Sequence, residues 1–278
     1  MNFRSIFSFF ILLVVAQQSF AQDLFDYQHS KEYADYLFSA KRYPEAQREF
    51  ERAVFFQPAD TSAWWKLVRA TQFSGDYKSS LKQIDGFIHQ FGSPDKTISV
   101  SKFYSHIHLS QHEEARAVLV DNNKLESDDK RFLKLVSYAL EDRWDQVVPN
   151  SVDSTASYPM KPLFELSVNF ENEKMKSPFI AGAFSAIVPG TGKIYVGHWK
   201  DGLFSMLLFS TAAWQSYRGF AKSGVKSPIG WAFGGLATGF YLGNIYGSAK
   251  SAKKYNANKK EKYRTHVNSL LDIYYGIY

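Results

Sequence analysis

The sequence predicts an all-α protein, in which a helix-turn-helix solenoid is followed by a small α-helical membrane domain of two or three apolar segments. Three observations lead to this fold class. In the first half, a short pattern of aromatic and small residues recurs at intervals of 34, 35 and 32 residues, as in stacked helical hairpins. In the second half there are three apolar stretches without charged residues. In the last of them, glycine recurs every four residues.

Residues 1–21 are predicted to be a secretory signal peptide. Arg4 supplies the basic start, residues 6–16 form an apolar core of eleven residues, and Ser19 and Ala21 suit cleavage after Ala21. An apolar core of this length is short for a membrane span, which favours cleavage over an uncleaved N-terminal anchor. The chain has no cysteine, which excludes lipoprotein processing, disulfide bonds and thiol catalysis.

The net charge of +6 divides unevenly along the chain. Residues 22–170 contain 18 basic and 22 acidic residues, whereas residues 171–278 contain 14 basic and 5 acidic ones. This asymmetry indicates two modules with different surroundings, and a segment rich in proline, serine and threonine separates them. We therefore predict a repeat domain over 22–150, a linker over 151–177, a glycine-rich membrane domain over 178–249, and a basic, then aromatic, tail over 250–278.

The repeats are carried by an aromatic or histidine residue and a small or aliphatic residue three positions later. The four pairs are Tyr43 and Ala46, Tyr77 and Ser80, His112 and Ala115, and Trp144 and Val147. Small residues let two helices approach closely, larger ones such as Phe50 and Ile84 fill the space between hairpins, and Gly75 suits a turn. An ordinary helical bundle with accidental spacing is the alternative.

On these residues the first module resembles the tetratricopeptide repeat (TPR) family, whose unit is a helix-turn-helix of about 34 residues. The matching positions are Ala46, Phe50, Ala53 and Pro58 in the first unit, and Trp64, Leu67 and Gly75 in the second. The resemblance implies a groove, lined by the first helix of each hairpin, that binds a protein or peptide. The implied groove residues are Lys31, Asp35, Phe38, Trp65, Lys66, Arg69 and Gln72.

Trp64 and Trp65 are adjacent, so on a helix their rings point about 100° apart. One ring is then expected in the core. The other either anchors a partner at the surface or packs against the preceding repeat.

The membrane prediction depends on the apolar stretches 179–188, 202–217 and 228–247. The first is too short to cross a bilayer alone. Glycine rows in the outer two stretches predict close helix packing, either within the chain or between subunits. The rows are Gly182, Ala186 and Gly190, which start in the first stretch and end just after it, and Gly235, Gly239, Gly243 and Gly247 in the third.

The segment that begins at Pro189 and ends at Gly197 is not a phosphate-binding loop, because Ile187 stands where that motif needs glycine and Ile194 where it needs serine or threonine. Its Pro-Gly-x-Gly-x-x-Tyr-x-Gly pattern resembles the TM2 domain family, which implies membrane residence without a defined chemistry. Seven basic residues and one acidic residue follow over 248–264. If the chain crosses the membrane three times after an exported repeat domain, this basic segment lies in the cytoplasm, and if it crosses twice, the segment lies on the outer side. Alternatively, the segment binds anionic lipid at the membrane surface.

Catalysis has little support in the sequence. His108 and His112 are four residues apart, but histidines at a helix end and turn are ordinary surface residues, and there is no nucleophile-elbow motif, no glycosidase-type carboxylate pair and no zinc motif. We predict no enzyme activity, no catalytic residues, no metal and no cofactor.

The sequence thus favours a membrane-anchored scaffold or adaptor of the bacterial cell envelope, with its repeats in the periplasm and its C-terminal domain in a membrane, the inner one being favoured. The expected partners are a protein or peptide, membrane lipid and further copies of the chain, and nucleic acid is excluded by export. The alternative is an oligomeric membrane component, either a channel or a membrane-protein assembly factor, built on the glycine rows.

Overall fold

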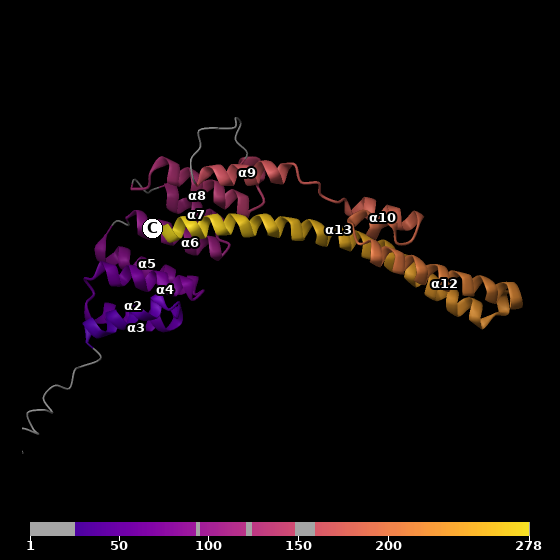
Figure 1. Ribbon diagram of the computed structural model, residues 1–278, viewed down its shortest axis with the longest axis horizontal. Coiled ribbons are helices and arrows are strands. Elements are labelled where there is room, and N and C mark those ends of the chain that lie inside the picture. Colours follow the sequence, from indigo (N-terminus) through magenta and orange to yellow (C-terminus); the bar gives the residue numbers. More distant parts are fainter. Residues whose placement is uncertain (1–25, 93–94, 121–123, 148–158, 278) are drawn as a thin grey trace, which may run out of the picture. The chain divides into compact units, whose positions relative to one another are not determined.

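The computed structural model describes residues 26–92, 95–120, 124–147 and 159–277, and every regular element in these ranges is a helix (Figure 1). The predicted all-α class is therefore confirmed. The described residues divide into two units, 26–137 and 138–277. The predicted signal peptide, residues 1–21, lies outside the described residues.

The first unit consists of helical hairpins that follow one another along the chain. The helices are α2 (Tyr27–Ser39), α3 (Tyr43–Phe56), α4 (Thr61–Phe73), α5 (Tyr77–Phe91), α6 (Lys96–His108), α7 (His112–Val120) and most of α8 (Ser127–Leu140), whose last three residues belong to the second unit. The recurring residues of the first three repeat pairs, Tyr43, Tyr77 and His112, are the first residues of α3, α5 and α7. The predicted helical repeat is present.

A turn residue with positive φ recurs at the same place in each hairpin. These residues are Lys41 (φ 58°), Gly75 (φ 86°), Ser110 (φ 58°) and Asp142 (φ 62°). The next amide donates to the carbonyl five residues earlier each time, as from Arg42 to Leu37 at 2.9 Å and from Asp76 to Thr71 at 3.1 Å. This is the hydrogen-bond pattern of a Schellman helix end, which satisfies carbonyl groups left over by the preceding helix.

An aspartate marks the start of the first helix in three hairpins. Asp26, Asp60 and Asp95 precede α2, α4 and α6, and each side chain accepts a hydrogen bond from a backbone amide of the first turn. Aspartate is among the best residues at this position, since its oxygen satisfies an amide that has no partner within the helix. The caps repeat with the same period as the turns and fix where each hairpin begins.

The core of this unit lies between the helices of consecutive hairpins. Ala46, Phe50 and Ala53 of α3 are fully buried together with Leu37 of α2 and Leu67 of α4. A second cluster joins α4, α5 and α6, and it contains Val68, Ile84, Phe87 and Ile98. Each hairpin therefore completes its core with residues of the next, as stacked repeats do.

The fourth repeat is incomplete. Trp144 does begin a helical turn, but this turn is only the short 3₁₀ helix η1 (Trp144–Gln146). The predicted linker over 151–177 is also wrong in part, because α9 (Met160–Glu171) lies within it. Met160, Leu163, Phe164 and Ser167 form a buried face at helical spacing, and Pro162 falls in the first turn, where a helix tolerates proline.

The second unit contains the three predicted apolar stretches, and each is helical. Its further elements are α10 (Pro178–Ile187), α11 (Thr191–Val196), α12 (Trp199–Ser223), η2 (Gly224–Lys226) and α13 (Pro228–Ile277). Helix α13 has 50 residues and continues through the predicted boundary at 249/250 without a break. The C-terminal tail is therefore not a separate segment, because neither proline nor a capping glycine interrupts the helix there.

Glycines allow close contacts among the helices of the second unit. A Cβ atom on Gly192 would lie 1.8 Å from the carbonyl oxygen of Ala181, and one on Gly190 would lie 2.2 Å from that of Gly202. A Cβ atom on Gly219 would lie 2.6 Å from the backbone nitrogen of Gly230. These glycines hold α10, α11, α12 and α13 at backbone contact distance.

Candidate functional site

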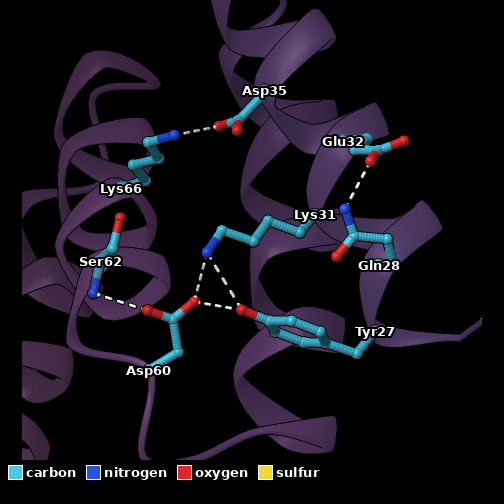
Figure 2. A network of polar contacts seen from close by, with 8 residues as sticks. All are labelled: Tyr27, Gln28, Lys31, Glu32, Asp35, Asp60, Ser62 and Lys66. Carbon is cyan, nitrogen blue, oxygen red and sulfur yellow. Dashed lines mark hydrogen bonds and ion pairs between the residues drawn. The ribbon is translucent and has the colours of Figure 1, made fainter.

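The predicted groove residues of the first unit lie where α2 faces α4. Lys31 Nζ donates to Asp60 Oδ2 at 2.6 Å and to the Tyr27 hydroxyl at 3.0 Å, and that hydroxyl donates to the same Asp60 oxygen (Figure 2). Asp60 also accepts from the Ser62 amide at 2.9 Å. One carboxylate thus caps α4 and joins it to α2.

Asp60 and Lys31 each shift the pKa of the other toward its charged form. Partial burial would raise the pKa of Asp60, but the hydrogen bonds from Lys31 and Tyr27 outweigh it and lower that pKa to about 2. The hydrogen bond to Asp60 raises the pKa of Lys31 above its ordinary value. Both side chains are therefore held in their charged forms at neutral pH.

A second ion pair links the same two helices. Lys66 Nζ lies 2.6 Å from Asp35 Oδ1, and the side chains are 35% and 40% exposed (Figure 2). Lys31, Asp35 and Lys66 are thus together on one face, as expected for groove residues, but their charges are already neutralised within the chain. A partner would meet a face of paired charges rather than a charged patch.

Two further groove residues belong to an aromatic cluster. The ring of Phe38 lies 6.3 Å from that of Phe50 and 6.0 Å from that of Phe73. The guanidinium of Arg69 lies over the rings of Trp65, at 5.3 Å, and Phe73, at 5.1 Å. Such cation–π contacts hold Arg69 along the surface of α4.

Trp64 and Trp65 are both partly buried, so neither of the two predicted roles fits fully. Trp64 packs against both core clusters, and its indole nitrogen donates to the Pro58 carbonyl at 3.0 Å. Trp65 packs against the cluster that contains Ile84, from the second helix of the same hairpin, and Ile98, from the following hairpin, and not against the preceding repeat.

Gln72 is the groove prediction that the structure contradicts, because its side chain is only 1% exposed. It donates to the Ser101 carbonyl at 2.8 Å and to Ser105 Oγ at 2.6 Å, and Ser105 also bonds Ser80. A buried amide needs such partners, and serines on α5 and α6 supply them. The spacing of Gln72 on α4 gave no sign of this interior polar network.

The third-stretch glycine row does not pack within the described chain. A Cβ atom on Gly235, Gly239 or Gly243 would meet nothing within 4 Å, and one on Gly247 would meet only the side chain of Lys193, at 3.8 Å. By contrast, Gly182 of the other predicted row faces α13, where a Cβ atom would lie 3.8 Å from Ile245. The Ala186 carbonyl accepts a hydrogen bond from the Tyr241 hydroxyl at 2.6 Å.

The other feature of the second unit is an apolar surface on α10, α12 and the first half of α13. On α12, Phe204 is 61% and Leu207 63% exposed. The remaining exposed members are Phe179, Ile180, Phe184 and Ile187 on α10, Trp199, Leu203, Leu208, Trp214 and Tyr217 on α12, and Ile229, Trp231, Leu236, Phe240, Leu242 and Tyr246 on α13. In the described part of the chain, no helix combines the length and the hydropathy of a membrane-spanning segment.

The histidines do not form a metal site in the described ranges, which hold no cluster of three or more metal-binding side chains. The ring of His108 stacks on Tyr77 at 4.5 Å and contacts Tyr104 at 4.3 Å. His106 bonds Gln111 at 2.9 Å. These rings contribute to helix contacts at the end of α6.

Comparison with known proteins finds no match to this chain among family models, curated proteins or solved structures. The helical repeat therefore stands on the chain's own spacing of turns, caps and core residues. Sequence reasoning missed Tyr27 and Asp60, although an aspartate directly before an apolar-periodic segment is a signal for a helix start.

Proposed function

We propose that this chain is a membrane-attached scaffold of the bacterial cell envelope. In this proposal, α10–α13 embed an apolar surface in lipid, and the helical hairpins, as TPR-like repeats, bind a protein or peptide in the periplasm. The observation that carries the proposal is the set of large apolar side chains exposed on α10, α12 and α13. Contiguous apolar patches of this extent are rare on soluble monomers and mark membrane or protein contacts.

The dimensions of the apolar surface suit a bilayer. Residues 202–217 of α12 and 228–249 of α13 contain no charged side chain. At 1.5 Å per residue these segments are about 24 Å and 33 Å long, close to the hydrocarbon core of about 30 Å. Glycine, tyrosine and tryptophan lower the mean hydropathy of both helices, but the large exposed side chains of these two segments are apolar or interfacial aromatic ones.

Vesicle flotation of the full chain tests lipid attachment. We expect the wild-type chain to float with phospholipid vesicles, and the double variant Phe204→Asp/Leu207→Asp to lose most of this binding, because carboxylates in hydrocarbon are costly. The matched control is Phe55→Asp/Phe56→Asp, which changes two exposed side chains of α3 in the same way. Equal loss in both variants, or no flotation of the wild type, would refute lipid attachment by this surface.

The proposed partner site is the face shared by α2 and α4. It presents two neutralised ion pairs beside the partly buried ring of Trp65 and the guanidinium of Arg69. Tryptophan and arginine are the residues most enriched among the strongest contributors to protein interfaces. This face therefore suits a peptide held by ring and hydrogen-bond contacts more than by net charge.

Photo-crosslinking in the cell tests this site. The exposed glutamates Glu32 on α2 and Glu51 on α3 form a matched pair, since each accepts a hydrogen bond from a glutamine four residues earlier. A crosslinking residue at position 32 is expected to give an adduct of one defined mass that position 51 does not give. The adduct should disappear in Trp65→Ala. Equal adducts from both positions would count against the groove.

The alternative function, an oligomeric membrane component, is favoured by one observation. Gly235, Gly239 and Gly243 present an open helix face on which a second helix can pack closely. Under this alternative, detergent-solubilised chain forms oligomers that Gly239→Leu abolishes and Leu236→Ala does not. If the wild-type chain and both variants are monomeric in detergent, this alternative is wrong and the scaffold remains the proposed function.

A further inference from the structure

Five lysines of the second unit lie at one end of its apolar surface. Helices α12 and α13 are antiparallel, with Gly219 against Gly230 and the rings of Phe209 and Tyr241 5.9 Å apart. Extended by nine residues toward the start of α12, this register brings Lys200 to the level of Lys250 along the hairpin. The apolar segments 202–217 and 228–249 both end at this level.

Helix α10 begins at the same level. Its Ser185 bonds Ser248 at 2.7 Å, and the amide of Lys176, just before α10, donates to Asn256 Oδ1 at 2.8 Å. Lys176 is thus beside the turn of α13 that carries Lys253 and Lys254. We define the basic collar as Lys176, Lys200, Lys250, Lys253 and Lys254.

The collar lysines are not neutralised by acidic side chains. Across the described residues, none of the five forms an ion pair, and four are exposed. Between residues 174 and 260 the chain has 12 basic residues and a single acidic one, Asp201. Further along α13 the situation differs, since Lys259 pairs with Glu173 at 2.9 Å and Lys260 with Asp142 at 3.2 Å.

Aromatic rings accompany the collar. The ammonium of Lys176 lies 4.7 Å from the centre of the Tyr195 ring, and that of Lys200 lies 5.7 Å from the Trp199 ring. Trp199 is itself 56% exposed. Tryptophan and tyrosine prefer the level of the lipid headgroups, so rings and lysines mark the same depth.

We infer that the basic collar binds anionic phospholipid headgroups and makes membrane attachment selective for them. The inference rests on the proposed lipid attachment of α10–α13 and adds the class of lipid. The apolar surface would enter the hydrocarbon, while unpaired ammonium groups at its edge meet phosphate and other anionic groups. Each lysine near an anionic surface strengthens binding by about fivefold.

Arg218, Lys222 and Lys226 form a separate basic group near the α12–α13 turn. Arg218 is about 26 Å along the hairpin from the collar, as judged from the 17 or so intervening helical residues. At this distance, substitutions in one basic group do not alter the surroundings of the other. The collar, with five cations and two rings at its level, is the larger.

The test compares vesicles of phosphatidylcholine alone with vesicles that also contain phosphatidylglycerol, using the full chain. We expect clearly tighter binding to the second kind. The collar variant Lys250→Gln/Lys253→Gln/Lys254→Gln should weaken binding to anionic vesicles on the order of 100-fold and leave binding to phosphatidylcholine nearly unchanged. The control Arg48→Gln/Lys78→Gln/Lys82→Gln removes three exposed cations from α3 and α5 and should have little effect.

The outcomes separate this inference from the proposed function. Equal binding to both kinds of vesicle would refute headgroup selectivity by the basic collar but would leave the proposed lipid attachment in place. Binding to neither kind would refute both the inference and the proposed lipid attachment. If the control variant weakens binding as much as the collar variant does, the effect is one of net charge and the collar is not a site. Circular dichroism of each variant confirms that the helices are retained, so that lost binding reports the lysines.

Discussion

At the level of single residues, Asp60 serves two contacts with one carboxylate. One oxygen caps α4 through the Ser62 amide, and the other receives Lys31 and Tyr27 from α2. Its side chain is 13% exposed, whereas that of Asp35 in the neighbouring ion pair is 40% exposed. A less exposed pair is screened less by water and salt, so Asp60 should contribute more to stability than Asp35.

The pKa of Asp60 makes this contribution depend on pH. It is about 2 in the folded chain against an ordinary value of 3.8. A lowered pKa means that the stabilisation is complete above pH 4 and is lost as the pH falls through about 2. The difference corresponds to about 2 kcal/mol. We therefore expect Asp60→Asn, which can still cap α4, to be about 2 kcal/mol less stable than wild type at pH 7 and to lose this deficit below about pH 2.

Urea denaturation followed by helical circular dichroism at pH 7, 4 and 2 measures this effect. Asp35→Asn is the control, and as an exposed ion pair it should cost less than about 1 kcal/mol. A deficit that is equal for the two variants, or independent of pH, would contradict the role given to Asp60.

At the level of elements, the place of a glycine in the fold, and not its regular spacing along the sequence, decides whether it allows close helix packing. Gly190, Gly192 and Gly202 lie where backbones of α10, α11 and α12 meet, but they do not form a regular row. The regular row of α13, in contrast, faces open space at Gly235, Gly239 and Gly243. A four-residue period shows that one helix face is smooth, and only the fold determines whether another helix covers it.

Two substitutions test this difference. Gly192→Ala should destabilise the second unit by about 3 kcal/mol, because its methyl group would collide with the Ala181 carbonyl. Gly239→Ala should stabilise helix α13 by up to about 1 kcal/mol, since alanine is the better helix former and nothing lies nearby. Thermal unfolding of the full chain, followed by circular dichroism, gives both signs. A destabilising Gly239→Ala would mean that another helix covers this face.

The same elements show how far the sequence could be interpreted. Periodic signals with a chemical cause were sufficient to predict the helical repeat, and its recurring residues Tyr43, Tyr77 and His112 are the first residues of α3, α5 and α7. The proline- and serine-rich composition of residues 151–177 predicts a linker, but α9 lies within this range and accommodates Pro162 in its first turn. Gln72 could not be placed from one sequence, since its burial depends on Ser101 and Ser105 of another helix.

At the level of the whole molecule, the two units carry surfaces of opposite kind. The first unit pairs charges across its helices, as Lys31 does with Asp60, and most of its rings are buried or partly buried. The second exposes its rings and aliphatic side chains and gathers unpaired lysines at one end of them. A membrane-attached scaffold requires two binding surfaces in one chain, one for the partner and one for the membrane.

If the two activities belong to different units, each can be removed alone. Phe204→Asp/Leu207→Asp should release the chain from vesicles, while a crosslinking residue at position 32 still gives its adduct. Trp65→Ala should abolish the adduct, since its ring packs beside the proposed groove, while the chain still floats with vesicles. The two assays on the two variants give four values, each compared with that of the wild-type chain. Loss of both activities in either single variant would mean that partner binding and lipid attachment share one surface, and the division of labour proposed for the two units would then be wrong.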